Sequence, residues 1–154
     1  MLKTALAHLG ILWPLGCSGH GSQVLIADGN YPFVTGSPSV AKKVSHNLSL
    51  GKVSETHVLA TLVQSIPIEA ATVMVPPVGA EQCIFVEFRG LLPGGLEITP
   101  LKRHEFYDLS RSPNTGVVVA TGEQRRFANL LLTIGVVLAV GDRPARMHGI
   151  GAMV

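Results

Sequence analysis

The chain has 154 residues, the size of one domain, and is long enough to bury a substantial core. Its net charge of +2, with no Lys/Arg run longer than two residues, excludes the basic stripe typical of nucleic-acid binders. Charged residues make up only 14% of the chain, against about a quarter in ordinary domains. Since 47% of the residues are hydrophobic, we expect a homo-oligomer that buries much of the outer surface of each copy.

The N-terminal segment, residues 2–12, carries apolar residues at mostly helical spacing, and Pro14 and Gly16 are expected to end that helix. The opening "MLKTALAHLGILWPLGC" superficially resembles a signal peptide. However, it contains a single lysine, a histidine within its apolar part, and Pro14. A core-facing helix in a cytoplasmic protein is therefore favoured. The apolar stretch at 128–141 is too short to span a bilayer, so no membrane partner is expected.

A glycine-flanked histidine precedes the first predicted strand. The turn is Gly19-His20-Gly21, and the strand "QVLIAD" at residues 23–28 ends in Asp28. The glycines let another molecule come close to the imidazole, which titrates near neutral pH. Ligands in open α/β sheets bind outside the carboxyl ends of strands, which makes Asp28 a candidate contact. The loop "GNYPFVTGSPS" follows.

The middle of the chain is predicted to hold one helix and two strands. Ser54 is a candidate N-cap for a helix through about Gln64, with inward-facing Val58, Leu59, Leu62 and Val63. "AATVMVP" and "CIFVEF" are interpreted as strands joined by "PVGAEQ", and "LLPGG" as a turn.

In the C-terminal third, Thr99-Pro100 is typical of a helix start, here for a helix carrying "KRHEFYDLSR". "GVVVATG" indicates a strand, and "ANLLLTIGVVLAV" a long last strand. The tail "DRPARMHGIGAMV" is expected to be loose or held only by a neighbouring subunit. Strands alternating with helices predict a single α/β domain over residues 1–154, with a central mixed sheet covered by helices.

Motif spacing argues against several kinds of chemistry. Cys17 and Cys83 form no CxxC pair, and the remaining histidines show no metal-ligand spacing, so neither a metal nor a disulfide framework is expected. No phosphate loop, dinucleotide motif or nucleophile elbow occurs, so no cofactor is expected. What remains is acid–base chemistry on a small neutral polar ligand. A lone histidine such as His20 is, however, more often a structural hydrogen-bonding group than a catalyst.

Four segments in this order and spacing resemble the ribose pyranase / fucose mutarotase family: "GHG", "VLIADGNYP", "RHEFYDLSR" and "VVVATGEQRRFANLLLTIGVV". The similarity runs from about Leu2 to Val137, is most specific in the fourth segment, and is loose over residues 34–98. It implies a cofactor-free isomerase that interconverts monosaccharide anomers. It also implies a ring-shaped homo-oligomer, with a decamer as one candidate, and sites near the subunit boundaries.

By this resemblance, His20 matches the general acid of the family and Asp28 its first sugar contact. Arg103 falls where fucose-type members have arginine and ribose-type members have histidine, which favours a fucose-like sugar. The sugar-binding Tyr-Ala/Gly-Asn segment of the family corresponds to Phe127, Ala128 and Asn129.

Three positions depart from the family pattern. Ser22 stands for an acidic residue, Gly29 for an alanine, and Phe127 for a tyrosine whose hydroxyl could bond the sugar or relay a proton. These departures keep a second hypothesis open, a non-catalytic sugar-binding accessory protein of a transport or catabolic system. A purely structural oligomeric module ranks last. The identity of the sugar and the occurrence of pyranose–furanose exchange stay open.

Overall fold

A computed structural model describes residues 2–139, which form a six-stranded sheet with the order β2-β5-β1-β6-β3-β4. Five strands are mutually parallel, and β6 runs antiparallel to its two neighbours, β1 and β3. The strands are β1 (Gln23–Ala27), β2 (Lys42–Ser45), β3 (Ile68–Val75), β4 (Ile98–Lys102), β5 (Thr115–Ala120) and β6 (Leu130–Ile134). The expected α/β fold with a mixed sheet is thus confirmed.

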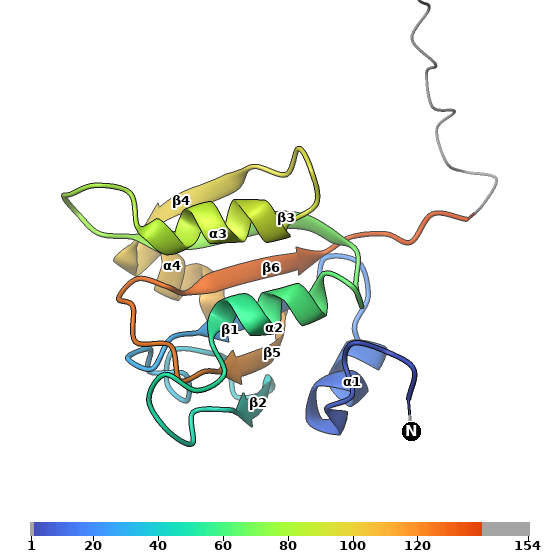
Figure 1. Cartoon of the computed structure of the whole chain (residues 1–154). Coiled ribbons are helices and arrows are strands. Elements are labelled where there is room, and N and C mark those ends of the chain that lie inside the picture. The colour runs from blue at the N-terminus through green and yellow to red at the C-terminus, as the bar shows by residue number, and fades with distance from the viewer. Residues whose placement is uncertain (1, 140–154) are drawn as a thin grey trace, which may run out of the picture.

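Helices cover both faces of this sheet (Figure 1). They are α1 (Leu9–Gly16), α2 (Glu55–Leu62), α3 (Cys83–Leu91) and α4 (Arg103–Ser110). The first three contribute to one apolar cluster together with Val24 and Ile26, and α4 packs through Phe106 in a second cluster with Leu25 and Ala27. Successive β1 residues therefore face opposite layers, and all five are buried. Among the described residues, no helix is long and apolar enough to cross a bilayer.

Several predicted elements are confirmed. Strands β1, β3 and β5 lie where the sequence predicts them. Helix α2 begins after Ser54, whose hydroxyl accepts a hydrogen bond from the His57 backbone N–H, and it ends at Leu62. The tail at 142–154 lies outside the described residues.

The first helix was predicted at the wrong place. Helix α1 begins only at Leu9, and Pro14 lies inside it and is buried. A proline in a helix removes one backbone donor, and at the sixth position of this short helix the loss affects a single hydrogen bond. The preceding segment is not helical, but it still buries Leu6 against the core.

The segment "CIFVEF" is helical, not a strand. Ile84, Phe85 and Phe88 are buried, which is the i, i+1, i+4 spacing of one helix face. A strand would alternate and bury Val86, which is 63% exposed. The density of β-branched and aromatic residues concealed the helical period.

The boundaries of two C-terminal elements also differ from prediction. Thr99 and Pro100 lie in β4, and α4 starts only at Arg103. Pro100 is tolerated there because β4 is an edge strand paired with β3 alone. The last strand ends at Ile134, where Gly135 N–H turns to donate to the Pro67 carbonyl. The short edge strand β2, with three polar residues of four, gave no signal in the sequence.

Glu55, the first residue of α2, is completely buried, and neither of its carboxyl oxygens has a hydrogen-bond partner among the described residues. Burial, together with the nearby negative charges of Asp28 and Glu123, raises the pKa of this carboxyl well above its ordinary 4.5. Glu55 therefore favours its neutral form in the folded chain.

Replacing Glu55 with glutamine is expected to stabilise the protein at neutral pH and to have little effect near pH 4. The unfolded chain releases the Glu55 proton above pH 4.5, whereas the folded chain retains it. The free energy of unfolding of the parent therefore falls as pH rises, by up to about 1.4 kcal/mol per pH unit, and Glu55→Gln removes that loss. Urea unfolding at several pH values measures the difference. Glu97→Gln, at an exposed position, is the matched control, and parallel curves for Glu55→Gln and parent would contradict the assignment.

Candidate functional site

The carboxyl ends of the parallel strands form one edge of the sheet, and the antiparallel β6 starts at this same edge. Asp28 follows β1, Asn129 precedes β6, and Arg103 follows β4, so the topology collects them there. A cleft of about 350 Å³ lies between them. Its lining residues are Asp28, Asn30, Tyr31, Met74, Arg103, Tyr107, Arg126, Phe127 and Asn129.

Asp28 and Asn129 hold each other through two hydrogen bonds. The Asp28 N–H donates to Asn129 Oδ1 at 3.0 Å, and Asn129 Nδ2 donates to Asp28 Oδ2 at 3.0 Å. The other carboxyl oxygen, Oδ1, accepts from the Asn30 N–H at 2.8 Å. The two residues are only 3% and 1% exposed, so both side chains are held rigidly in the floor of the cleft.

The charge state of Asp28 reflects two opposing effects. Burial raises the pKa of its carboxyl above the ordinary value, and hydrogen bonds from Asn30, Ala128, Tyr31 and Asn129 partly oppose that shift. Asp28 lines the cleft, and each oxygen of a carboxylate can accept more than one hydrogen bond. It is therefore equipped to accept hydrogen bonds from the hydroxyls of a ligand.

Phe127 forms one wall of the cleft in an unusual backbone conformation. Its φ of 62° lies in the left-handed region, which non-glycine residues rarely adopt. The guanidinium carbon of Arg103 lies 5.6 Å from the centre of the Phe127 ring, within cation–π range. Ala128 does not line the cleft: it is fully buried in the core and serves to connect Phe127 to Asn129.

Five cleft residues were not predicted from the sequence as site residues, and two of them, Asn30 and Tyr31, follow closely after Asp28. Tyr107 lies one turn after Arg103 on α4, so a helical face could have revealed it. Met74 comes from the end of β3, and Arg126 from the loop before β6. No sequence signal distinguishes Arg126 from a surface arginine, because only the loop geometry places it at the cleft.

His20 lies at the opposite edge of the sheet. Its turn precedes β1 and lies beside the carboxyl end of β6, where the Gly21 N–H donates to the Ile134 carbonyl at 2.9 Å. The length of β1, roughly 16 Å at about 3.3 Å per residue, separates the His20 turn from Asp28. His20 is 62% exposed, and its Nε2 lies 2.9 Å from Glu69 Oε2. One chain therefore does not bring His20 and Asp28 together.

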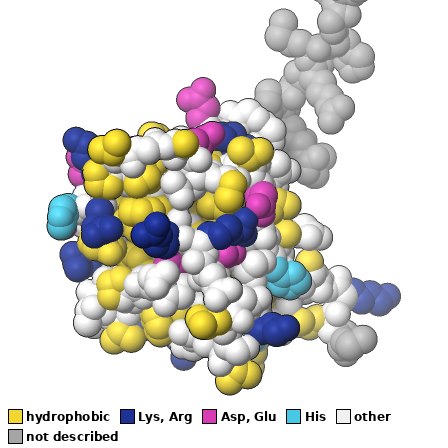
Figure 2. All heavy atoms as spheres, turned by 60° about the vertical axis from the view of Figure 1, so that its left-hand side comes forward, with side chains coloured by type: hydrophobic (Ala, Val, Ile, Leu, Met, Phe, Trp, Pro, Cys, Tyr) yellow, Lys and Arg dark blue, Asp and Glu magenta, His cyan; other side chains and the backbone are white. Residues whose placement is uncertain are grey.

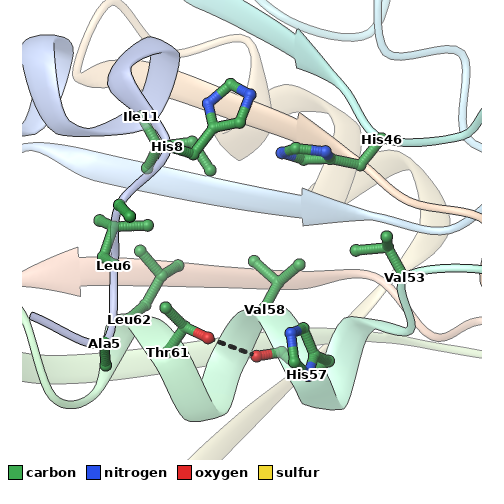
Figure 3. A pocket seen from close by; sticks show the side chains of 11 residues that line it. Ala5, Leu6, His8, Ile11, His46, Val53, His57, Val58, Thr61 and Leu62 are labelled. Atoms are coloured by element: carbon green, nitrogen blue, oxygen red, sulfur yellow. Dashed lines mark hydrogen bonds between the residues drawn. The ribbon is translucent and has the colours of Figure 1, made fainter. Parts of the chain in front are cut away.

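A second pocket, of about 220 Å³, lies between the N-terminal segment and α2 (Figure 3). It is mostly apolar, with Thr61 and three histidines, His8, His46 and His57, as its polar lining. The His8 and His46 rings meet edge to face at 4.6 Å, and burial, followed by His8, lowers the pKa of His46. Within residues 2–139, no three His, Cys, Asp or Glu side chains gather as a metal site. Lacking carboxylate and amide groups, this pocket suits a polyhydroxylated ligand less well than the cleft at the carboxyl edge.

Comparison with known proteins agrees with this architecture. Residues 1–137 match the RbsD / FucU transport protein family. The chain belongs to this family. It is 29% identical over 137 residues to a D-ribose pyranase of Staphylococcus haemolyticus, a match that covers 89% of this chain and 99% of the relative. The resemblance noted from the sequence motifs is thus confirmed.

Two solved structures of the family share the fold. RbsD of Bacillus subtilis, complexed with D-ribose, superposes with a TM-score of 0.77 at 24% identity and covers 90% of this chain and 100% of its own. The fucose mutarotase of Streptococcus pneumoniae, in complex with L-fucose, gives a TM-score of 0.75 at 25% identity with the same coverage of both chains.

Replacing Asn129 with alanine is expected to lower the free energy of unfolding by about 1–3 kcal/mol, because the buried Asp28 N–H and carboxylate both lose a partner. Denaturant unfolding measures the change. Gln124→Ala, in the exposed part of the same loop, is the control. Equal stability of the two variants would show that the Asp28–Asn129 pair does not hold the cleft together.

Proposed function

We propose that this protein is a cofactor-free monosaccharide mutarotase, an isomerase that interconverts sugar anomers through acid–base ring opening. The observation that carries the proposal is the rigid Asp28–Asn129 pair in a cleft at the carboxyl edge of the sheet. Membership of the RbsD / FucU family and the names of the relatives support it. The ring opening needs only groups that donate and accept protons, and the side chains supply these.

Anomer exchange moves two protons. One goes to the ring oxygen and another leaves the anomeric hydroxyl, so that the ring opens, the carbonyl turns over, and the chain recloses. Water catalyses this slowly, and a placed acid–base group accelerates such a step by about 10²–10⁴-fold. We assign the transfer to His20, whose Nε2 is engaged by Glu69, which leaves Nδ1 for the sugar. Asp28 and Asn129 hold hydroxyls through directional hydrogen bonds.

Because His20 and Asp28 lie at opposite edges of the sheet, the proposed site combines two copies of the chain. The surroundings of His20 support such a contact: Val136 and Val137 next to it are 56% and 80% exposed, which is unfavourable in a lone chain. The low charge content points the same way. We propose a ring-shaped homo-oligomer in which one copy presents His20 to the cleft of its neighbour.

The sugar preference is assigned to Arg103 and Phe127. Arg103, held over the Phe127 ring, presents a fork of donors toward the cleft. This matches fucose-type members of the family, so we propose a fucose-like sugar as the preferred neutral substrate. Phe127 stands where the family has a tyrosine. Tyr107, from α4, supplies a phenol to the cleft instead.

Sugar binding without catalysis is the second candidate function. Phe127 favours it, because the family tyrosine at this position carries a hydroxyl that Phe127 lacks. The two functions differ in whether the protein accelerates anomer exchange, which magnetisation-exchange NMR on anomeric protons measures directly.

His20→Gln is expected to abolish accelerated exchange while sugar affinity changes only a few-fold, since glutamine forms hydrogen bonds but does not shuttle protons near neutral pH. Asp28→Asn is expected mainly to weaken binding, by about 1.5–3 kcal/mol per lost charge-assisted contact. Exchange rates and dissociation constants from NMR test both.

Mixing the two variants tests the shared site. Co-refolded His20→Gln and Asp28→Asn chains form some contacts in which both native residues meet, so part of the activity is expected to return. If the mixture, at a sugar concentration too low for Asp28→Asn to bind it, is no more active than its components, the site is not shared between copies. If His20→Gln alone exchanges anomers at the parent rate, sugar binding replaces catalysis as the function.

Exchange of L-fucose is expected to be faster than that of D-ribose, and Arg103→His is expected to reverse part of this preference by replacing a fork of donors with a single ring nitrogen. The ratio of the two exchange rates, in parent and variant, is the measurement. The control is His104→Gln at the next, exposed position, which does not line the cleft. Equal or faster ribose exchange by the parent would reject the role of Arg103.

A further inference from the structure

Two arginines line the cleft without a carboxylate partner. In residues 2–139, Arg89, Arg111 and Arg125 each lie within 4.0 Å of an acidic side chain, whereas Arg103 and Arg126 form no such pair. Both residues are exposed and line the same cleft, and the Arg103 guanidinium lies over the Phe127 ring of its wall. The two described arginines without a carboxylate partner are therefore both residues of the candidate cleft.

Asp28 does not neutralise this charge. It is the single acidic residue of the lining, its carboxyl is already held by Asn30 and Asn129, and burial raises its pKa. The lining carries a formal charge of +1 with Asp28 ionised and +2 with Asp28 protonated. Figure 2, turned to bring forward the side of the molecule with the carboxyl edge, shows Lys and Arg side chains across the middle of the surface, with apolar side chains and a few acidic ones beside them.

We infer that the cleft takes a monosaccharide that carries an anionic group, a carboxylate or a phosphate, away from its anomeric carbon. This inference rests on the proposed function and changes its substrate class: a fucose-like sugar remains the preferred neutral substrate, and a sugar with an added anionic group is bound more tightly. Asp28 and Asn129 in the floor accept and donate to hydroxyls, and Arg103 and Arg126 bind the anion. Guanidinium groups match carboxylate and phosphate oxygens in a bidentate fork, and the Phe127 ring holds one of them in place.

The replacement of the family tyrosine by Phe127 agrees with this substrate class. Losing the hydroxyl removes a donor for a neutral sugar, whereas the Phe127 ring still holds the Arg103 guanidinium within cation–π distance at the cleft. Hydroxyls of a neutral sugar can accept hydrogen bonds from these exposed guanidinium groups, but an anionic group forms stronger, charge-assisted ones.

A neighbouring copy offers another source of negative charge. If His20 of one copy enters the cleft of the next, Glu69 arrives with it, 2.9 Å from the imidazole. Neutralisation of the arginines by that carboxylate instead of by a ligand predicts that Arg126→Gln weakens assembly and leaves sugar selectivity unchanged. Light scattering, recorded alongside the exchange measurements, separates these outcomes.

The test compares sugars that differ only in the anionic group. L-fucose and L-galacturonate share one ring configuration and differ by a methyl against a carboxylate, and D-ribose 5-phosphate adds a phosphate to D-ribose. Exchange rates and dissociation constants come from anomeric-proton NMR at low and high salt. The anionic member of at least one pair is expected to bind about tenfold or more tightly, with an advantage that shrinks as salt screens it. The pair of sugars that shows this difference identifies whether the preferred anionic group is a carboxylate or a phosphate.

Arg126→Gln is expected to reduce the anionic preference by about tenfold, and Arg89→Gln is the matched control. Arg89 loses the same charge on α3, outside the cleft, so its ratio of anionic to neutral binding stays at the parent value. Neutral sugars binding as tightly as their anionic partners would overturn the inference, and so would an unchanged ratio in Arg126→Gln. Accelerated exchange of neutral sugars in that case would leave the mutarotase proposal intact. Anion-selective binding without exchange would remove the catalytic proposal and keep this one.

Discussion

The pairing of Asp28 with Asn129 depends on one topological constraint, the insertion of β6 between β1 and β3 in the opposite direction. An antiparallel strand in the middle of an otherwise parallel sheet brings its entry loop to the edge where its neighbours end. That arrangement lets two residues 101 positions apart exchange two hydrogen bonds. The loop before β6 supplies Phe127 and Arg126, so most of the cleft follows from the direction of this strand.

The same strand also carries the chain away from the cleft and ends beside His20. Gly21 and Ser22 form backbone hydrogen bonds with Ile134 at the far edge, and Glu69, the second residue of β3, contacts His20 there. Each end of the sheet thus presents different groups: a buried carboxylate–amide pair with two arginines at one end, and an exposed imidazole paired with a carboxylate at the other. A function that uses both ends has to be a property of the assembly, since neither end contains the other's groups.

Much of the fold could be predicted from local patterns, because buried strands such as β1 are continuous apolar runs and Ser54 caps α2 in the expected way. The failures have a common physical cause. In "CIFVEF" and in the segment around Pro14, tertiary burial outweighs intrinsic propensity, so β-branched residues enter a helix and a proline is tolerated within one. Motif matching found Asp28, Arg103, Phe127 and Asn129. The helical spacing from Arg103 could also have indicated Tyr107, whereas Arg126 reaches the cleft through loop geometry that no motif encodes.

The separation of His20 from Asp28 along β1 has a consequence for counting sites. If each copy presents its imidazole at one edge and its carboxylate at the other, copies joined head to tail in an open row complete one site fewer than their number, because the two end copies each keep an unmatched half. Closing the row into a ring removes both ends, and the number of complete sites then equals the number of subunits. Closure of the ring would in that way set the number of complete sites in the assembly. Loss of one subunit would leave two neighbouring copies each with an unmatched half-site.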